Sequence, residues 1–334
     1  IMKTFGQQYF EKTAYVNFDN NARMKQVFEG DLDIERLVLA ISAETGVSIE
    51  AENTLIIFDE IQEVPKALTS LKYFHENAPQ YAIVAAGSLL GVALHQGTSF
   101  PVGKVDFLDL YPLNFREFLC AMGEKQFVSM LDSCDTQMVT VFKTKYIERL
   151  REYYFVGGMP EVVKDFSEKK DYNRVRAIQK NLINYYQQDF SKHAEIKLVP
   201  RLNLVWNSIP MQLAKENKKY IYGQVREGSR AKDFELAIQW LLDCGLIHKV
   251  QRIQKPDLPL KAYIDFDAFK LFLVDIGLLI AMTDLDAKVI IEGNKIFTEF
   301  KGALTEQYIL QQLISDVGVI PYYYSTQNSK GEID

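Results

Sequence analysis

The first 122 residues alternate continuously apolar segments with amphipathic helical patterns, and this alternation constrains the fold more than any other feature of the chain. Strands that are apolar at every position are typical of a parallel sheet that helices cover on both faces. The expected elements are a helix to Tyr9, a strand over Ala14–Phe18, helices through Ala40, a strand over Leu55–Phe58, a helix over Ala67–Asn77 and a strand over Tyr81–Ala86. The pattern therefore predicts an α/β domain built from βαβ units.

The composition is that of a soluble globular protein. With 48% hydrophobic and 25% charged residues among 334, the chain has enough apolar material for packed cores. Its best apolar run, Tyr81–Leu94, is shorter than the roughly 20 residues that cross a bilayer, so we expect no membrane span. Three cysteines lie far apart, which argues against a disulfide framework or a zinc site and favours a cytoplasmic protein.

The middle of the chain is helical and then becomes basic. Residues 123–195 carry long helical patterns, whereas residues 196–255 hold 11 Lys and Arg against 5 Asp and Glu, a net charge of +6 in a chain whose total is -6. The basic segment is expected to contain a helix over Val199–Glu216, a short piece through Val225, a helix over Ala231–Cys244 and a strand over Leu246–Ile253. This order of elements predicts a winged helix-turn-helix.

The last segment, residues 256–334, mixes helices and strands. We expect a strand over Ala262–Phe266, an apolar helical run, a helix over Phe297–Ile314 and a strand over Ile320–Tyr324. The domain organisation that follows is an α/β core over 1–122, a helical region over 123–195, the winged helix over 196–255 and a further α/β segment over 256–334.

Two carboxylates, Asp59 and Glu60, directly follow the apolar strand Leu55–Phe58. Ligands of open α/β sheets bind at the carboxyl ends of the strands. There the first acid can hold Mg²⁺ through its water shell, and the second can orient a water for attack on a γ-phosphate. Ser88, after the next strand, then lies at the same edge as a sensor of the phosphate or the water. The alternative is that all three residues cap helices.

The phosphate-loop pattern G-x-x-x-x-G-K-[ST] does not occur in the chain. The nearest run, Gly97–Val105, has one residue too many after Gly97, and Val105 stands where Ser or Thr must reach Mg²⁺. Lys104 is therefore not a phosphate-loop lysine.

Several motifs together resemble a known family, the bacterial and archaeal P-loop ATPases of the AAA+ type that carry a C-terminal domain of unknown function. The acidic strand end corresponds to their Walker B motif. The resemblance covers nearly the whole chain, in the segments Phe58–Gln62, Ala86–Leu90, Phe100–Val105, Leu110–Phe118, Tyr154–Glu161 and Phe272–Leu279. In the family the phosphate loop lies immediately before the residue that matches Ile1. We therefore expect that the sequence begins after this loop and also stops early, at Asp334.

The resemblance implies ATP and Mg²⁺ as cofactors and ATP hydrolysis as the activity. It makes Asp59 the magnesium-side acid, Glu60 the base that polarises water and Ser88 the sensor. Lys104 would offer a positive charge to the nucleotide, and Arg116 would act in trans as an arginine finger. The alternative for these two cations is a solvated surface role. A ring or a dimer is expected by analogy.

The basic segment suggests contacts with the phosphates of duplex DNA. The residues expected to make them are Arg226, Arg230, Lys232, Lys218 and Lys219. Winged helices also dock proteins, so a protein partner is the alternative.

The final segment resembles the start of a PD-(D/E)xK nuclease-like domain of the restriction-endonuclease type, with Glu306 and Asp334 as candidate metal ligands. The strand with the lysine would follow Asp334, so the domain is partial. A degenerate fold kept for scaffolding is the alternative. For the whole protein, the rivals to an ATPase are a DNA-binding nuclease-like protein that its ATPase core regulates, and a non-catalytic interaction module.

Overall fold

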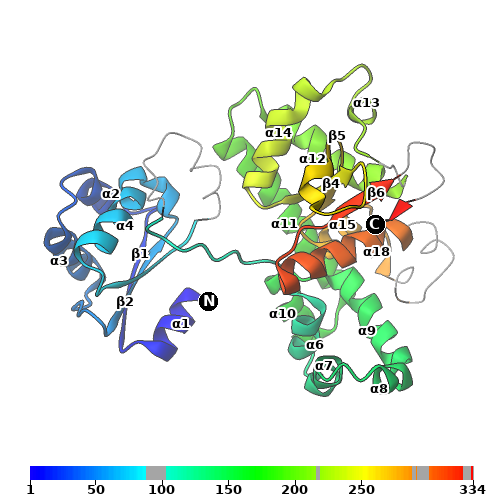
Figure 1. Ribbon diagram of the computed structural model, residues 1–334. Coiled ribbons are helices and arrows are strands. Elements are labelled where there is room, and N and C mark those ends of the chain that lie inside the picture. Colours follow the sequence, from blue (N-terminus) through cyan, green and yellow to red (C-terminus); the bar gives the residue numbers. More distant parts are fainter. Residues whose placement is uncertain (88–102, 216–218, 288–290, 292–300, 326–331, 334) are drawn as a thin grey trace. The chain divides into compact units, whose positions relative to one another are not determined.

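The computed structural model describes residues 1–87, 103–215, 219–287, 291, 301–325 and 332–333 (Figure 1). The chain divides into two compact units, Ile1–Asp109 and Leu110–Asp334. In the part of the chain that the structure describes, none of the helices combines the length and apolar character needed to cross a membrane.

The first unit is built on a parallel sheet, as predicted. Its strands lie in the order β1 (Lys12–Asn17), β2 (Thr54–Asp59) and β3 (Ala82–Ala85). The helices are α1 (Met2–Tyr9), α2 (Ala22–Glu29), α3 (Ile34–Thr45) and α4 (Pro65–Asn77), with a 3₁₀ turn η1 (Ile61–Glu63) between β2 and α4. The central strand β2 pairs in parallel with both neighbours.

One face of the sheet packs on α2, α3 and α4. Ala14 and Val16 of β1 and Ile56 and Phe58 of β2 are buried in one core with side chains of these helices. The ring of Phe58 meets that of Phe28 edge to face, with centroids 5.6 Å apart. Thr54–Phe58 is buried throughout, which explains why that part of the strand is apolar at nearly every position.

The other face of the sheet meets α1. A Cβ added at Gly6 of α1 would lie within 3.3 Å of Leu55 on β2 and would also collide with Thr13 on β1, so helix and sheet are in close contact. Because side chains alternate along a strand, Tyr15 of β1 and Asp59 of β2 point to this same face.

The second unit begins with a helical array and then adds a mixed sheet. Its helices are α6 (Phe115–Ala121), α7 (Lys125–Asp132), α8 (Thr136–Val141), α9 (Lys143–Val156), α10 (Pro160–Lys169), α11 (Tyr172–His193), α12 (Val199–Ala214), α13 (Tyr222–Val225), α14 (Ala231–Asp243), α15 (Ile276–Met282) and α18 (Lys301–Gln312), with the shorter turns η2 (Leu260–Tyr263) and η3 (Leu313–Val317). Its strands are β4 (Ile247–Ile253), β5 (Ile264–Leu273), β6 (Tyr322–Ser325) and β7 (Glu332–Ile333), in the order β5-β4-β6-β7. β4 is antiparallel to β5 and parallel to β6.

The order α12, α13, α14, β4 agrees with the elements expected for the basic segment. Trp206 of α12 and Trp240 of α14 are buried, and both meet the ring of Phe190 on α11.

The strand expected over Ala262–Phe266 was wrong in position. The structure places a 3₁₀ turn at Leu260–Tyr263, and β5 then continues through Leu273, so the following helix starts only at Ile276. The reason is pairing with β4, which buries residues 268–273, all of them apolar except Lys270, on a sheet. The predicted boundary after residue 255 falls in the connection between these two paired strands.

A buried carboxylate joins three parts of the second unit. Asp275, fully buried, accepts hydrogen bonds from the backbone N–H of Gly158 at 2.6 Å and of Leu278 at 3.0 Å, and from the Gln311 amide at 3.1 Å. Burial raises the pKa of Asp275, while these donors act in the opposite direction. Gly157 has a left-handed φ of +76°, and a Cβ at this residue would overlap the carboxylate. The close approach of the backbone at residue 157 to the Asp275 carboxylate therefore needs a glycine.

We expect Gly157→Ala to destabilise the second unit far more than Gly228→Ala. Gly228 has a φ of +77° but open space around a Cβ, so both variants place an L-residue at a positive φ, at a cost of about 1–2 kcal/mol. Only Gly157→Ala adds overpacking against a buried carboxylate, a further ~1–3 kcal/mol. Urea unfolding followed by fluorescence measures the difference; equal losses in the two variants would contradict this role of Gly157.

Candidate functional site at the carboxyl end of β2

The carboxyl ends of the three parallel strands form one edge of the first unit. Asp59 is the last residue of β2 and lies opposite Asn17, the last residue of β1. The chain after β3 stays at this edge, because the Ala86 N–H donates to the Phe58 carbonyl at 2.8 Å and the Ala86 carbonyl accepts from the Ile61 N–H at 3.1 Å. The two predicted acids therefore stand where ligands bind in α/β sheets.

The Asp59 carboxylate is held from two sides. Its Oδ2 accepts a hydrogen bond from the Tyr15 hydroxyl at 2.6 Å, and its Oδ1 accepts one from the Glu60 N–H at 3.2 Å. The hydrogen bond to Asp59, followed by burial, raises the pKa of Tyr15 above that of a free tyrosine. The Lys3 ammonium lies 3.4 Å from the centre of the Tyr15 ring. Tyr15 thus remains a donor well into the alkaline range.

Glu60 adopts a conformation that is unusual for its residue type. Its φ is +52° and its ψ is +44°, in the left-handed region that is uncommon outside glycine. Its Oε2 accepts a hydrogen bond from the Gln62 amide at 2.6 Å. Such backbone outliers persist where the surroundings hold them in place and occur often at functional sites.

Neither acid caps the following helix. The 3₁₀ turn that starts after Glu60 has no side-chain cap, and α4 begins with Pro65 after an uncapped Val64. The helix-cap alternative for Asp59 and Glu60 is therefore wrong in this structure.

Sequence reasoning missed Tyr15 and Gln62. Along β1, the half-exposed Tyr15 and Asn17 alternate with the buried Ala14 and Val16. This alternation of polar and buried positions is the signal that could have placed the Tyr15 hydroxyl on one face. Gln62 follows the acids within two residues, but nothing in the sequence indicates which way its amide points.

Two of the other predicted nucleotide-site residues form ion pairs with acids other than Asp59 and Glu60. Ser88 is outside the described residues. Lys104 forms an ion pair with Glu76 at 3.4 Å. Arg116 lies on α6 in the second unit and forms an ion pair with Asp132.

The donor set at this edge suits a hydrated magnesium ion. Within the described ranges, no three His, Cys, Asp or Glu side chains gather as a metal cluster. Mg²⁺ prefers oxygen ligands, and it commonly binds one or two carboxylates while it keeps several of its waters. Asp59 and Glu60 are the residues that fit such an ion.

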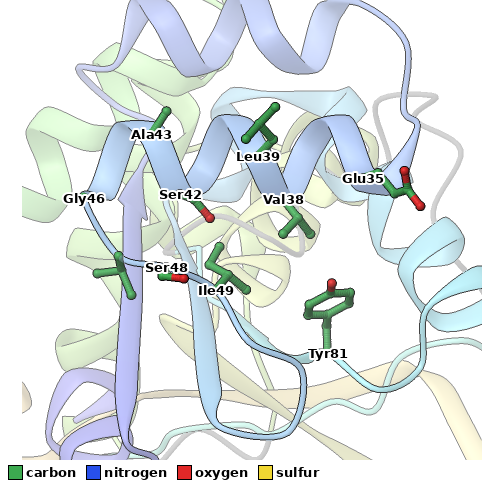
Figure 2. Close-up of a pocket in the computed structure, with 10 residues that line it drawn as sticks. Glu35, Val38, Leu39, Ser42, Ala43, Gly46, Ser48, Ile49 and Tyr81 are labelled. Carbon is green, nitrogen blue, oxygen red and sulfur yellow. The ribbon is translucent and has the colours of Figure 1, made fainter.

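The structure also has an open hollow beside α3 (Figure 2). It is lined mainly by apolar side chains, including Val38, Leu39 and Ile49, and the one carboxylate among its lining residues is Glu35. Tyr81 lines it just before the amino end of β3, whereas the acids follow the carboxyl end of the parallel strand β2. The hollow therefore lies toward the opposite end of the sheet from the acids and is separate from the candidate site.

The predicted nucleic-acid contacts gather before and at the start of α14. Arg226 and Arg230 are exposed in the loop after α13, and Lys232 is exposed on the first turn of α14. These three residues and Lys219 have no ion-pair partner within 4.0 Å among the described residues. Lys218 is outside the described residues.

Glu306, the predicted metal ligand on α18, pairs with a lysine. Its Oε2 lies 2.9 Å from the Lys270 ammonium on β5, and that ammonium also stands 5.0 Å from the centre of the Tyr323 ring. The Lys270 side chain is only 9% exposed. Asp334 is outside the described residues, so the predicted pair of metal ligands stays a prediction.

Comparison with known proteins matches two parts of the chain to two different family models. Residues 1–119 match a family model described as an AAA domain, and residues 147–289 match a domain of unknown function (DUF8612). A search of curated proteins finds no match. The first match supports an AAA-type P-loop ATPase that binds ATP, in agreement with the parallel sheet and its acidic edge, and the role of the C-terminal part is unknown.

We expect Asp59→Asn to lower the pKa of Tyr15 toward that of free tyrosine, because the charged acceptor of its hydroxyl is lost. Carbon-13 NMR of tyrosine rings, titrated with base and assigned with Tyr15→Phe, measures the change. Glu63→Gln removes a charge from the same turn and is the control. An unchanged Tyr15 titration in Asp59→Asn would show that the hydrogen bond is absent in solution.

Proposed function

We propose that the protein is a Mg²⁺-dependent ATPase whose catalytic acids are Asp59 and Glu60. The observation that supports this best is the pair of carboxylates at the carboxyl end of β2, with Glu60 held in a left-handed conformation. The match of residues 1–119 to an AAA domain supports the same reading.

The reaction assigned to this edge is in-line attack of water on the γ-phosphate. Glu60 accepts a hydrogen bond from the attacking water and aligns it. The oxygen–phosphorus bond to water forms as the bond to the β–γ bridging oxygen breaks, and the proton that the water loses passes by way of Glu60 to the phosphate product or to solvent, which yields ADP and inorganic phosphate. Asp59 holds the Mg²⁺ ion through water, and the ion supplies neutralisation of phosphate charge. Ser88 is proposed as the sensor of the γ-phosphate or water.

Lys104 and Arg116 are proposed as additional nucleotide contacts. Each has an acidic partner, Glu76 for Lys104 and Asp132 for Arg116, so each must exchange that ion pair for a phosphate. Both pairs are partly solvent-exposed, and exposed ion pairs contribute little stabilising free energy. Breaking them to bind a phosphate therefore costs little. Arg116 would act in trans, within a homo-oligomer.

We expect Glu60→Gln to retain ATP binding and to lose turnover by about 100-fold or more, since the amide no longer aligns water as a base. Phosphate release and binding of a fluorescent ATP analogue are measured on the natural full-length protein. Glu63→Gln, a partly buried acid of the same turn that pairs with Lys25, is the control and should hydrolyse ATP normally. Unchanged turnover in Glu60→Gln would refute the catalytic assignment.

For the C-terminal part we propose duplex DNA as the partner of a winged helix formed by α12, α13, α14 and the β4–β5 pair. The specific observation is that Arg226, Arg230 and Lys232 are exposed around the start of α14 and unpaired among the described residues. Lys219, which also has no ion-pair partner among the described residues, and Lys218 are proposed as further phosphate contacts. We also propose that residues 256–334 have a nuclease-like fold with Glu306 and Asp334 as metal ligands, and that the protein is cytoplasmic.

We expect duplex affinity to fall steeply between 50 and 200 mM salt, because bound phosphates release counterions. Alanine at Arg226, Arg230 and Lys232 together should reduce the slope of log affinity against log salt by about 3. Fluorescence anisotropy with duplexes of different sequence measures both effects. Alanine at Lys125, Lys143 and Lys145, which lie outside the basic segment, is the matched control. No duplex binding at low salt would refute DNA as the partner and favour a protein.

A further inference from the structure

We propose that Tyr15 is a positioning residue for the Mg²⁺-side acid: its hydroxyl fixes the carboxylate of Asp59 in the orientation that receives the hydrated ion. This inference rests on the proposed ATPase function and adds a residue of β1 to its metal site.

The geometry determines the direction of the hydrogen bond. The Asn17 amide donates to the Tyr15 hydroxyl oxygen at 3.4 Å, and the hydroxyl lies 2.6 Å from Asp59 Oδ2. A carboxylate oxygen accepts, so the Tyr15 hydroxyl donates its proton to Asp59, while the hydroxyl oxygen accepts from the Asn17 amide. A separation of 2.6 Å is typical of a hydroxyl bound to an ionised carboxylate, the stronger class of hydrogen bond.

The contact holds the whole carboxylate plane. Tyr15 binds Oδ2, and the Glu60 N–H at 3.2 Å binds Oδ1, so both oxygens have a fixed donor. Each carboxylate oxygen accepts two hydrogen bonds, which leaves one position on each for water bound to the metal. Partners of this kind orient the groups that hold a metal, and their loss commonly weakens metal affinity by 10–100-fold.

Position in the fold makes Tyr15 suited to this role. β1 and β2 are neighbours in register, and both side chains lie on the face that meets α1. The Lys3 ammonium of α1 covers the Tyr15 ring at 3.4 Å. Tyr15→Phe keeps this ring and its contact with Lys3 and removes only the hydroxyl, so it isolates the hydrogen bond.

The test compares nucleotide affinity with and without the metal. On the natural full-length protein, the dissociation constant of a fluorescent ATP analogue is measured in EDTA and in saturating Mg²⁺. In Tyr15→Phe the gain in affinity on adding Mg²⁺ should shrink by about tenfold relative to wild type, while the affinity in EDTA stays the same. Turnover of the variant should recover as Mg²⁺ is raised. Tyr81→Phe, which removes a hydroxyl before the amino end of β3, is the matched control.

Each other outcome overturns the inference in a recognisable way. A normal gain on adding Mg²⁺ in Tyr15→Phe would exclude the positioning role and leave the ATPase proposal intact. Equal loss of affinity in EDTA and in Mg²⁺ would indicate that Tyr15 only supports the fold. A wild-type protein that binds no nucleotide in either condition would overturn the proposed function itself, and this inference with it.

Discussion

Burial of one strand on both faces is the constraint on which the first unit depends. Because Thr54–Phe58 has neighbours on each side and helices on each face, no polar side chain can be satisfied there except at the ends. The two carboxylates that follow must therefore emerge together at the carboxyl edge of the sheet. The left-handed backbone of Glu60 occurs at the point where the chain leaves the buried strand.

In the second unit, by contrast, a carboxyl group lies in the interior of the fold. Asp275 is surrounded by donors from Gly158, Leu278 and Gln311, which lie far apart in the chain. The Leu113 N–H donates to the Gly158 carbonyl at 2.7 Å, so the first residues of the unit are bound to the same glycine. The hydrogen bonds of one buried carboxyl group thus connect the start, the middle and the end of the described part of this unit.

Features that depend on local sequence were predicted, whereas features that depend on contacts between distant residues were not. The strands and helices of the first unit were predicted because an apolar run or an amphipathic face is a local signal, and an AAA domain match agrees with them. The extent of β5 could not be predicted, because pairing with β4 decides where that strand ends and α15 begins. The position of Asp59 and Glu60 at the end of a strand was predicted, but the hydrogen bond from Tyr15 to Asp59 was not, because it depends on the order of strands in the sheet.

By itself, the sequence determined the residue types at each strand end and the charge of each segment: two acids after an apolar strand, and a net +6 over residues 196–255. These properties need only the order of residues along the chain. Tertiary structure alone decided the partners: Tyr15 meets Asp59 across 44 positions, and Lys270 meets Glu306 across 36. The physical reason is that a hydrogen bond or an ion pair forms only within a few ångströms, and folding decides which distant residues come that close.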